Sequence, residues 1–362
     1  MESEIEEEII ALAAASVLIK RTKRRRKRPK FHINPYLQLR NIKGRYLASG
    51  SYQRHVASVY RVSKQAIGKI IDRTCEALYK SLKPITPQIW LNISNRYHEL
   101  WNLPNCVGAI DGKHVQIVNP PNSGSSFYNY KGFFSIVLMG VCDADYRFTY
   151  VDIGAYGSES DSNIFRKCDF GKSLSRDELN LPPDAKINGQ PIPFYFVADD
   201  AFPLHRRILK PYSPSRNAQL TNSERIFNYR LSRARRCIEN AFGILCSRWR
   251  VLAKSLQMKP ERVQKIVAAC LLHNFLMNEV KSTYCPDGYA DQLDDNGDII
   301  EGGWRVNLPA NSCQNSQFSP NVAGRTSENA KLIRDCVKEY VNGDRGALAW
   351  QTMRVLGLIR NE

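Results

Sequence analysis

Long hydrophobic runs are absent from this sequence of 362 residues. The most apolar stretch is residues 9–19, and its eleven residues fall short of the roughly 18 that a membrane-spanning helix needs. Five glutamates precede this stretch and a basic tract follows it, which reverses the charge order of a secretory signal peptide. We therefore expect neither a membrane span nor export.

Closely spaced cysteine pairs are also missing. None of the ten cysteines has C-x-x-C spacing, which argues against a zinc ribbon or a dithiol redox site. Without an export signal, we expect reduced thiols that pack as small hydrophobic side chains. Cys270 and His273 lie three residues apart, as a metal pair would, but the apolar helical pattern around them favours core packing.

Acidic residues are scarce, with 35 Asp and Glu against 52 Lys and Arg and a formal charge of +17. The excess lies in two blocks: residues 20–30 contain nine basic side chains and no acid, and residues 201–254 contain twelve against two acids. Two such blocks indicate a polyanionic partner, because neutralised phosphates release their condensed counterions. Double-stranded DNA is the expected partner, and a solvated basic surface is the alternative.

The first basic block lies in an N-terminal tail, residues 1–45, which is acidic and then basic and which we expect to be partly disordered. Clustered cations of this kind predict nuclear import or a non-specific DNA contact. A nuclear protein is therefore expected, with a cytoplasmic pool left open. The import residues are Lys23, Arg24, Arg25, Arg26, Lys27 and Arg28.

Residues 46–100 are expected to form a DNA-binding region with a helix-turn-helix pattern. Pro84 and Pro87 mark the end of the second helix of that pattern. A helical pattern over residues 51–60 is followed by a short break and by a second helix whose N-cap is Ser63. In such an arrangement the second helix can enter the major groove, although many helical hairpins look alike. The residues expected to contact DNA are Ser63, Lys64, Gln65 and Lys69.

Residues 101–280 change to β-rich runs and long helices, which predicts an α/β domain. Strands are expected at residues 106–118, 133–142, 146–154 and 194–198, with a polar insertion at 157–193. Asp143 to Asp145 form a hairpin signal. Helices are expected at 224–252 and 260–278, and residues 281–362 form a loop-rich extension with two more helices. The apolar stripe of the first helix is Phe227, Leu231, Ala234, Ile238, Phe242, Leu245, Trp249 and Leu252.

Three acids stand out by their position. Asp111 ends the first strand, Asp199 ends the fourth, and Glu239 lies beside the apolar stripe of the basic helix. Such carboxylates can converge, and two divalent cations would offset their mutual repulsion. One cation would activate water and the other would stabilise the leaving oxygen of a phosphodiester, with Mg²⁺ or Mn²⁺ favoured by hard oxygen ligands. The alternative is that these acids are caps, turn residues and ion-pair partners.

Basic side chains around Glu239 would bind the DNA backbone. They are Arg230, Arg233, Arg235, Arg236, Arg248 and Arg250.

Five segments carry a family resemblance: GAIDGKHV (108–115), FYNYKGFFSIVLMGVCDADYRFTYVDIGAYGSESDSNIF (127–165), VADDAFPL (197–204), FNYRLSRARRCIENAFGILCSRWRVL (227–252) and LLHNF (271–275). Together they resemble PIF/Harbinger-type DDE transposases and their domesticated nuclease relatives, over about residues 40–280. The resemblance implies an RNase H-like core, with a mixed sheet flanked by helices, behind an N-terminal all-α helix-turn-helix region. Matched position by position, its Asp-Asp-Glu metal site is Asp111, Asp199 and Glu239. Lys113 and Asp200 depart from the family pattern.

The resemblance favours a divalent-metal-dependent DNA endonuclease of transposase origin. The alternative is a catalytically silent DNA-binding or chromatin adaptor that keeps the three acids by descent. The family also implies a separate Myb-like protein partner. The oligomeric state stays open, and a homo-oligomer is compatible with the sequence.

Overall fold

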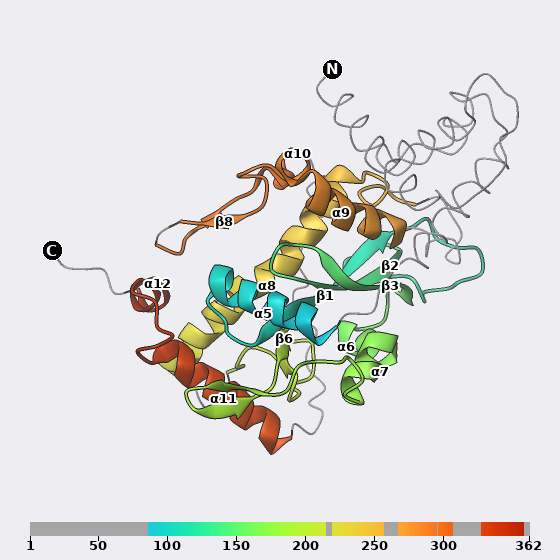
Figure 1. Cartoon of the computed structure of the whole chain (residues 1–362). Coiled ribbons are helices and arrows are strands. Elements are labelled where there is room, and N and C mark those ends of the chain that lie inside the picture. The colour runs from blue at the N-terminus through green and yellow to red at the C-terminus, as the bar shows by residue number, and fades with distance from the viewer. Residues whose placement is uncertain (1–85, 215–218, 257–266, 295, 307–326, 358–362) are drawn as a thin grey trace, which may run out of the picture.

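The computed structural model describes residues 86–214, 219–256, 267–294, 296–306 and 327–357. At its centre is a five-stranded mixed sheet with the strand order β3-β2-β1-β6-β7 (Figure 1). The strands are β1 (Cys106–Gln116), β2 (Ser135–Cys142), β3 (Phe148–Tyr156), β6 (Tyr195–Val197) and β7 (Ile208–Leu209). The first three are antiparallel neighbours, whereas β6 and β7 continue the sheet parallel to β1. The α/β class with a mixed sheet is thus confirmed.

Helices flank this sheet and two small strand pairs lie outside it. The helices are α5 (Pro87–Trp101), α6 (Asp161–Lys167), α7 (Asp169–Ser175), α8 (Asn222–Arg248), α9 (Val267–Glu279), α10 (Lys281–Tyr284), α11 (Glu328–Asn342) and α12 (Gln351–Leu356), with a 3₁₀ turn at Gly303–Arg305. The pairs are β4 (Ala185–Ile187) with β5 (Gln190–Ile192), and β8 (Gln292–Leu293) with β9 (Ile299–Ile300).

The middle of the sheet is covered on both faces. All eight residues of β2 are buried, which explains why its sequence is a continuous apolar run rather than an alternating one. The turn into β3 is fixed by Asp143, whose Oδ1 accepts hydrogen bonds of 2.9 Å from the backbone N–H groups of Asp145 and Arg147. The hairpin signal in the sequence is therefore confirmed.

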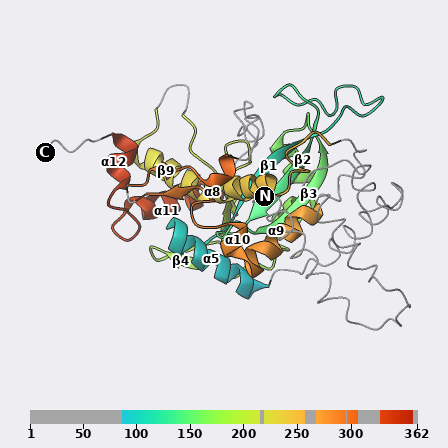
Figure 2. The same ribbon diagram turned by 90° about the horizontal axis from the view of Figure 1, so that it is seen from above.

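Helix α8 is the longest element and connects the sheet to the C-terminal helices. A capping box of Thr221 and Glu224 starts it, and every residue of its expected apolar stripe is buried. Phe242 packs directly over β2, where a side chain on Gly140 would come within 2.9 Å of the ring. Figure 2 shows α8 running from α11 and α12 at one end to the strands at the other.

Helix α5 starts at Pro87, where the sequence pattern indicated the end of the helix-turn-helix segment. Pro87 occupies the first turn behind the Thr86 N-cap, a position where a missing N–H costs nothing. Trp90 packs edge-on against Phe196 at 5.7 Å, and the Tyr97 hydroxyl donates to the Cys142 carbonyl oxygen at 3.1 Å. Residues 87–101 therefore belong to the packed core beside β1.

The expected insertion at 157–193 is more structured than its polar composition indicated, since it forms α6, α7 and the β4-β5 pair. The expected helix-turn-helix before Pro84 and the N-terminal tail lie outside the described residues. Among the described helices, none has the length and apolar character needed to cross a membrane.

The expected core role of Cys270 and His273 is confirmed. Both are buried, and the His273 ring nitrogens lie 2.8 Å from the Tyr146 carbonyl oxygen and 3.0 Å from the Tyr284 hydroxyl. Burial lowers the pKa of His273 to about 4, so the imidazole is neutral at physiological pH. All eight cysteines in the described part of the chain are free, and seven are buried.

Candidate active site

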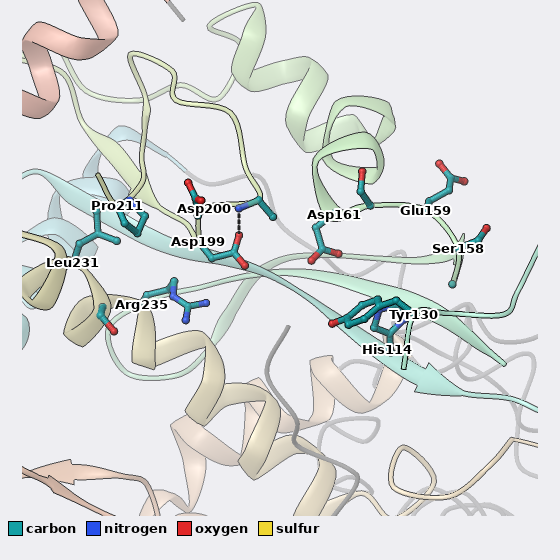
Figure 3. A pocket seen from close by; sticks show the side chains of 14 residues that line it. His114, Tyr130, Ser158, Glu159, Asp161, Asp199, Asp200, Pro211, Leu231 and Arg235 are labelled. Carbon is teal, nitrogen blue, oxygen red and sulfur yellow. Dashed lines mark hydrogen bonds between the residues drawn. The ribbon is translucent and has the colours of Figure 1, made fainter. Parts of the chain in front are cut away.

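The parallel pairing of β1 with β6 brings two of the expected acids together. Ala109 lies opposite Val197, and the same register carried two residues further places Asp111 beside Asp199, just past the end of β6. Asp111 is 8% exposed and its Oδ1 accepts the Gly112 N–H at 2.9 Å. Asp199 Oδ1 accepts the Ala201 N–H at 3.0 Å, the dashed bond in Figure 3.

Helix α8 supplies the third acid. Asp111 pairs across the strands with Gly140, over which Phe242 of α8 packs, so α8 lies on the face of β1 to which Asp111 points. Arg235, one turn before Glu239, donates to Glu239 Oε1 at 2.7 Å, and its other terminal nitrogen lies 3.8 Å from Asp111 Oδ2. The guanidinium therefore links the β1 carboxylate to the α8 carboxylate.

The electrostatics of this cluster favour a cation. Burial raises the pKa of Asp111 well above its usual value; Arg235 opposes the rise, while Asp199, Asp161 and Glu239 add to it by repulsion. Burial alone would lower the pKa of Arg235, but Asp111, Glu239 and Asp199 outweigh it and raise the value. Arg235 thus offsets part of the repulsion among these carboxylates, as Lys131 does for Asp161.

A cavity of about 320 Å³ opens beside the cluster, lined by Asp199 and Arg235 at one end and by His114 and Tyr130 at the other (Figure 3). A fourth acid, Asp161, lines it from the first residue of α6. The sequence analysis did not single out Asp161, because it considered acids at the ends of expected strands and Asp161 lies in the expected polar insertion. Its one signal was its position in GSESDSNIF, inside a segment that carries the family resemblance.

Asp161 lies against the strand that carries Asp111. A Cβ atom on Gly112 would come within 2.2 Å of Asp161 Oδ1, so only glycine leaves room for this carboxylate. Burial, reinforced by the charge of Asp199, raises the pKa of Asp161 to about 7, while Lys131 opposes the rise.

The two ring side chains at the far end of the cavity, His114 and Tyr130, have strongly shifted pKa values. His114 Nδ1 lies 2.9 Å from the Ser135 hydroxyl oxygen, and burial lowers the His114 pKa to about 4, helped by Lys131 and Lys113. The pKa of Tyr130 rises to about 12 through burial and the nearby acids, Asp161 first among them. Both rings are therefore uncharged at neutral pH, with Lys131 and Lys113 acting on His114 and the acids acting on Tyr130.

A divalent cation suits the donor chemistry of this cluster. Asp111, Asp161, Asp199 and Glu239 offer hard carboxylate oxygens, the ligands that Mg²⁺ and Mn²⁺ prefer. Burial and mutual repulsion raise the pKa values of Asp111 and Asp161, and a bound cation would favour their ionised forms. Within the described residues, no three acid, histidine or cysteine side chains form a ready-made metal shell. In this structure Arg235 forms ion pairs with Asp111 and Glu239.

Comparison with known proteins identifies the family of the region that carries these acids. A family model described as a DDE superfamily endonuclease matches residues 110–274, the span that contains all four acids. The chain carries a DDE superfamily endonuclease domain.

Relatives of the DDE domain extend the match. The chain is 25% identical over 307 residues to the protein named Antagonist of Like Heterochromatin Protein 1 of Arabidopsis thaliana, covering 82% of this chain and 71% of that protein. It is 27% identical over 251 residues to "Putative nuclease HARBI1" of Rattus norvegicus, covering 67% of each chain. The resemblance to Harbinger transposase-derived nucleases is thus confirmed. No solved structure shows a significant match.

Most of the six arginines that were expected to bind the DNA backbone make contacts inside the fold. Arg235 pairs with acids, Arg236 lies 3.8 Å from the buried Asp291, and Arg248 donates to the Tyr284 carbonyl oxygen at 2.8 Å. Arg230 and Arg233 are also buried, and of the six arginines only Arg250 is exposed. Residues C-terminal to α8 contact four of the six arginines, namely Arg230, Arg233, Arg236 and Arg248.

The remaining expected DNA contacts and the expected import residues lie outside the described residues. These are Ser63, Lys64, Gln65 and Lys69 of the expected recognition helix, and the import residues between Lys23 and Arg28.

Proposed function

We propose that this protein is a divalent-metal-dependent DNA endonuclease that hydrolyses phosphodiester bonds at Asp111, Asp199 and Glu239. The main support is the convergence of these acids around Arg235, inside a span that matches DDE endonucleases. A nuclease domain implies a DNA substrate, and the basic composition of the chain agrees with one.

In this proposal the three carboxylates would hold two divalent cations, of which one would activate a water molecule and the other would stabilise the leaving oxygen. Strand β1 and the end of β6 position Asp111 and Asp199 rigidly, while α8 brings Glu239 to them. Lys113 and Lys131 add positive potential near His114, which would attract the phosphate backbone toward the cavity. His114, being neutral, leaves the negative charge of the acids available for a metal.

The wider biology is also a proposal. Residues 20–30 would direct the protein to the nucleus, and the helix beginning at Ser63 would select the DNA site. A Myb-like partner would deliver the protein to DNA, as in the family it resembles.

The test is incubation of the purified full chain with supercoiled plasmid and Mn²⁺ or Mg²⁺. We expect cleavage products with 3′-hydroxyl ends, lost with EDTA and in Asp111→Asn. Cleavage that persists in Asp111→Asn would place the chemistry elsewhere.

A second candidate is a chromatin adaptor that binds DNA without cutting it. The observation that favours it is the name of one relative, which refers to a heterochromatin protein. DNA binding with no Mn²⁺ binding and no cleavage would favour the adaptor.

A further inference from the structure

We propose that the ring of Tyr130 stacks on an unpaired nucleobase next to the scissile phosphate, so that the protein prefers DNA whose strands are already separated at the cut. This inference rests on the proposed function and defines its substrate class. It concerns the end of the cavity away from Arg235, where Figure 3 shows the rings of Tyr130 and His114 together.

Tyr130 presents an exposed ring beside the proposed metal ligand Asp199. It is 55% exposed, although it lines the same cavity as Asp199. Its ring packs edge-on against the His114 imidazole, with the two centroids 5.6 Å apart. A DNA strand whose phosphate lies at the carboxylates would place the attached base at this end of the cavity. Every nucleobase has a π face, and stacking on aromatic side chains binds single strands with little regard to sequence.

A hydrogen-bonded turn holds the Tyr130 ring in this place. Asn129, which is 2% exposed, accepts a hydrogen bond from the backbone N–H of Lys131 at 3.0 Å. The side-chain amide of Asn129 donates to the Ser135 hydroxyl oxygen at 2.8 Å, and the same oxygen lies 2.9 Å from His114 Nδ1. One network therefore positions both rings. A ring that is positioned before binding loses little conformational entropy when a base stacks on it.

Two other exposed tyrosines near Tyr130 are packed differently. Tyr128 is 47% exposed, and its ring packs edge-on against Phe134 at 5.1 Å. Tyr156 is 48% exposed and packs in the same way against Phe127 at 4.9 Å. In the described part of the chain, the residues that line the cavity include Tyr130 but neither of these two. Tyr128 is therefore a matched control, two residues away on the same loop.

The charge around Tyr130 suits a nucleic acid strand. Lys131 Nζ lies 5.5 Å from the centroid of the Tyr130 ring, and burial together with the charges of Lys131 and Lys113 lowers the pKa of His114. Both ammonium groups are thus close enough to bind the phosphates that flank a stacked base. In a paired duplex the neighbouring bases cover both faces of each base, so Tyr130 can stack only on a base that has left the helix.

The experiment measures DNA binding to the full-length protein by fluorescence anisotropy in EDTA, where neither metal binding nor cleavage contributes. The two probes are labelled duplexes of one length, one fully paired and one with a central unpaired bubble. Wild type should bind the bubble roughly tenfold more tightly, and Tyr130→Ala should lose this preference, as loss of one base–aromatic contact predicts. Its binding to the paired duplex should not change. Tyr130→Phe, which keeps the ring, and Tyr128→Ala should behave as wild type does.

A bubble built from abasic nucleotides gives an independent test, because it removes the bases and leaves the protein unchanged. Wild type should lose its preference on this probe, and Tyr130→Ala should lose nothing further. If wild type binds both duplexes equally, or if Tyr130→Ala keeps the preference, the inference is overturned, while Mn²⁺-dependent plasmid cleavage still tests the proposed function separately. If cleavage is absent but the preference depends on Tyr130, the endonuclease is overturned and the stacking contact stands.

Discussion

Arg235 is the residue whose surroundings bear most directly on metal binding. Its guanidinium contacts Asp111 and Glu239, which are two of the three proposed metal ligands. A divalent cation and this guanidinium compete for the same carboxylate charge, so binding of one weakens the hold of the other.

Replacing Arg235 with glutamine should therefore tighten Mn²⁺ binding by about tenfold, equivalent to about 1.4 kcal/mol. In EDTA the same variant should be less stable by about 2 kcal/mol, because two partly buried carboxylates lose their partner. Calorimetry and urea denaturation measure the two effects. Arg236→Gln is the control, since its acid partner is Asp291, and it should leave the Mn²⁺ affinity unchanged. Weaker Mn²⁺ binding in Arg235→Gln would show that Arg235 supports the metal site.

The adjacent acids Asp199 and Asp200 should differ sharply. Asp199 continues the β6 register to a position beside Asp111, whereas Asp200 is engaged by Lys210 and by the Ser213 hydroxyl, each at 3.0 Å. Asp199→Asn should abolish Mn²⁺-dependent plasmid cleavage with the fold intact, and Asp200→Ser should retain most of it. The reverse result would mean that the register at the end of β6 is displaced by one residue.

At the scale of single elements, α8 both supplies the site and fastens the C-terminal helices. Arg230 is fully buried on α8 and donates to the carbonyl oxygens of Gly346 and Asn102 and to Gln351 Oε1, at 2.6 to 2.8 Å. Burial lowers its pKa to about 10, so it stays charged at neutral pH. An arginine that looked available for DNA in the sequence thus connects three segments of the fold.

Arg230→Met should lower the free energy of unfolding by about 3 kcal/mol, because buried oxygen acceptors lose their charged donor. Arg225 is the matched control on the same helix: it is exposed and makes one hydrogen bond, to the Val355 carbonyl oxygen at 2.9 Å. Arg225→Met should change stability by less than about 0.5 kcal/mol. Urea denaturation measures both, and equal losses would contradict a structural role specific to Arg230.

For the molecule as a whole, the acidic cluster makes stability depend on pH when no metal is bound. The pKa of Asp161 is raised from 3.8 to about 7 in the folded state, so the folded chain keeps a proton that the unfolded chain releases. The stability contribution of this group therefore falls as the pH rises from about 4 to about 7, and is constant above that range.

In EDTA, the melting temperature of Asp161→Asn minus that of wild type should therefore grow between pH 5 and pH 7 and then level off. His114 and His273, whose pKa values are lowered to about 4, give the opposite slope below pH 6.5, but they do so in both proteins and cancel in the difference. Thermal melts across this range are the measurement. A difference independent of pH would contradict the raised pKa.

Deletion of residues 20–30 tests whether the first basic block directs the whole protein to the nucleus. Removal of nine clustered cations should abolish nuclear accumulation of a tagged protein, as seen by fluorescence microscopy. Unchanged accumulation would indicate that a partner carries the protein into the nucleus.

Local sequence patterns predicted the parts of the fold that depend on periodicity. The β2-β3 hairpin, the buried strand β6 and the apolar stripe of α8 are present as expected, because alternation, turn residues and helical spacing are local properties. Helix α5 was missed because proline in the first turn of a helix and proline at its end look alike in sequence. Helices α6 and α7 were missed because seven residues are too few for a clear period.

The sequence by itself determined that this chain is basic, α/β and similar to DDE nucleases, and it singled out Asp111, Asp199 and Glu239. Only the tertiary structure decided which charges meet. The register of β6 against β1 places Asp199 beside Asp111, and Gly112 leaves room for Asp161. Packing also turned most of the α8 arginines inward. Contacts between segments distant in sequence depend on long-range packing, which residue spacing along one chain does not encode.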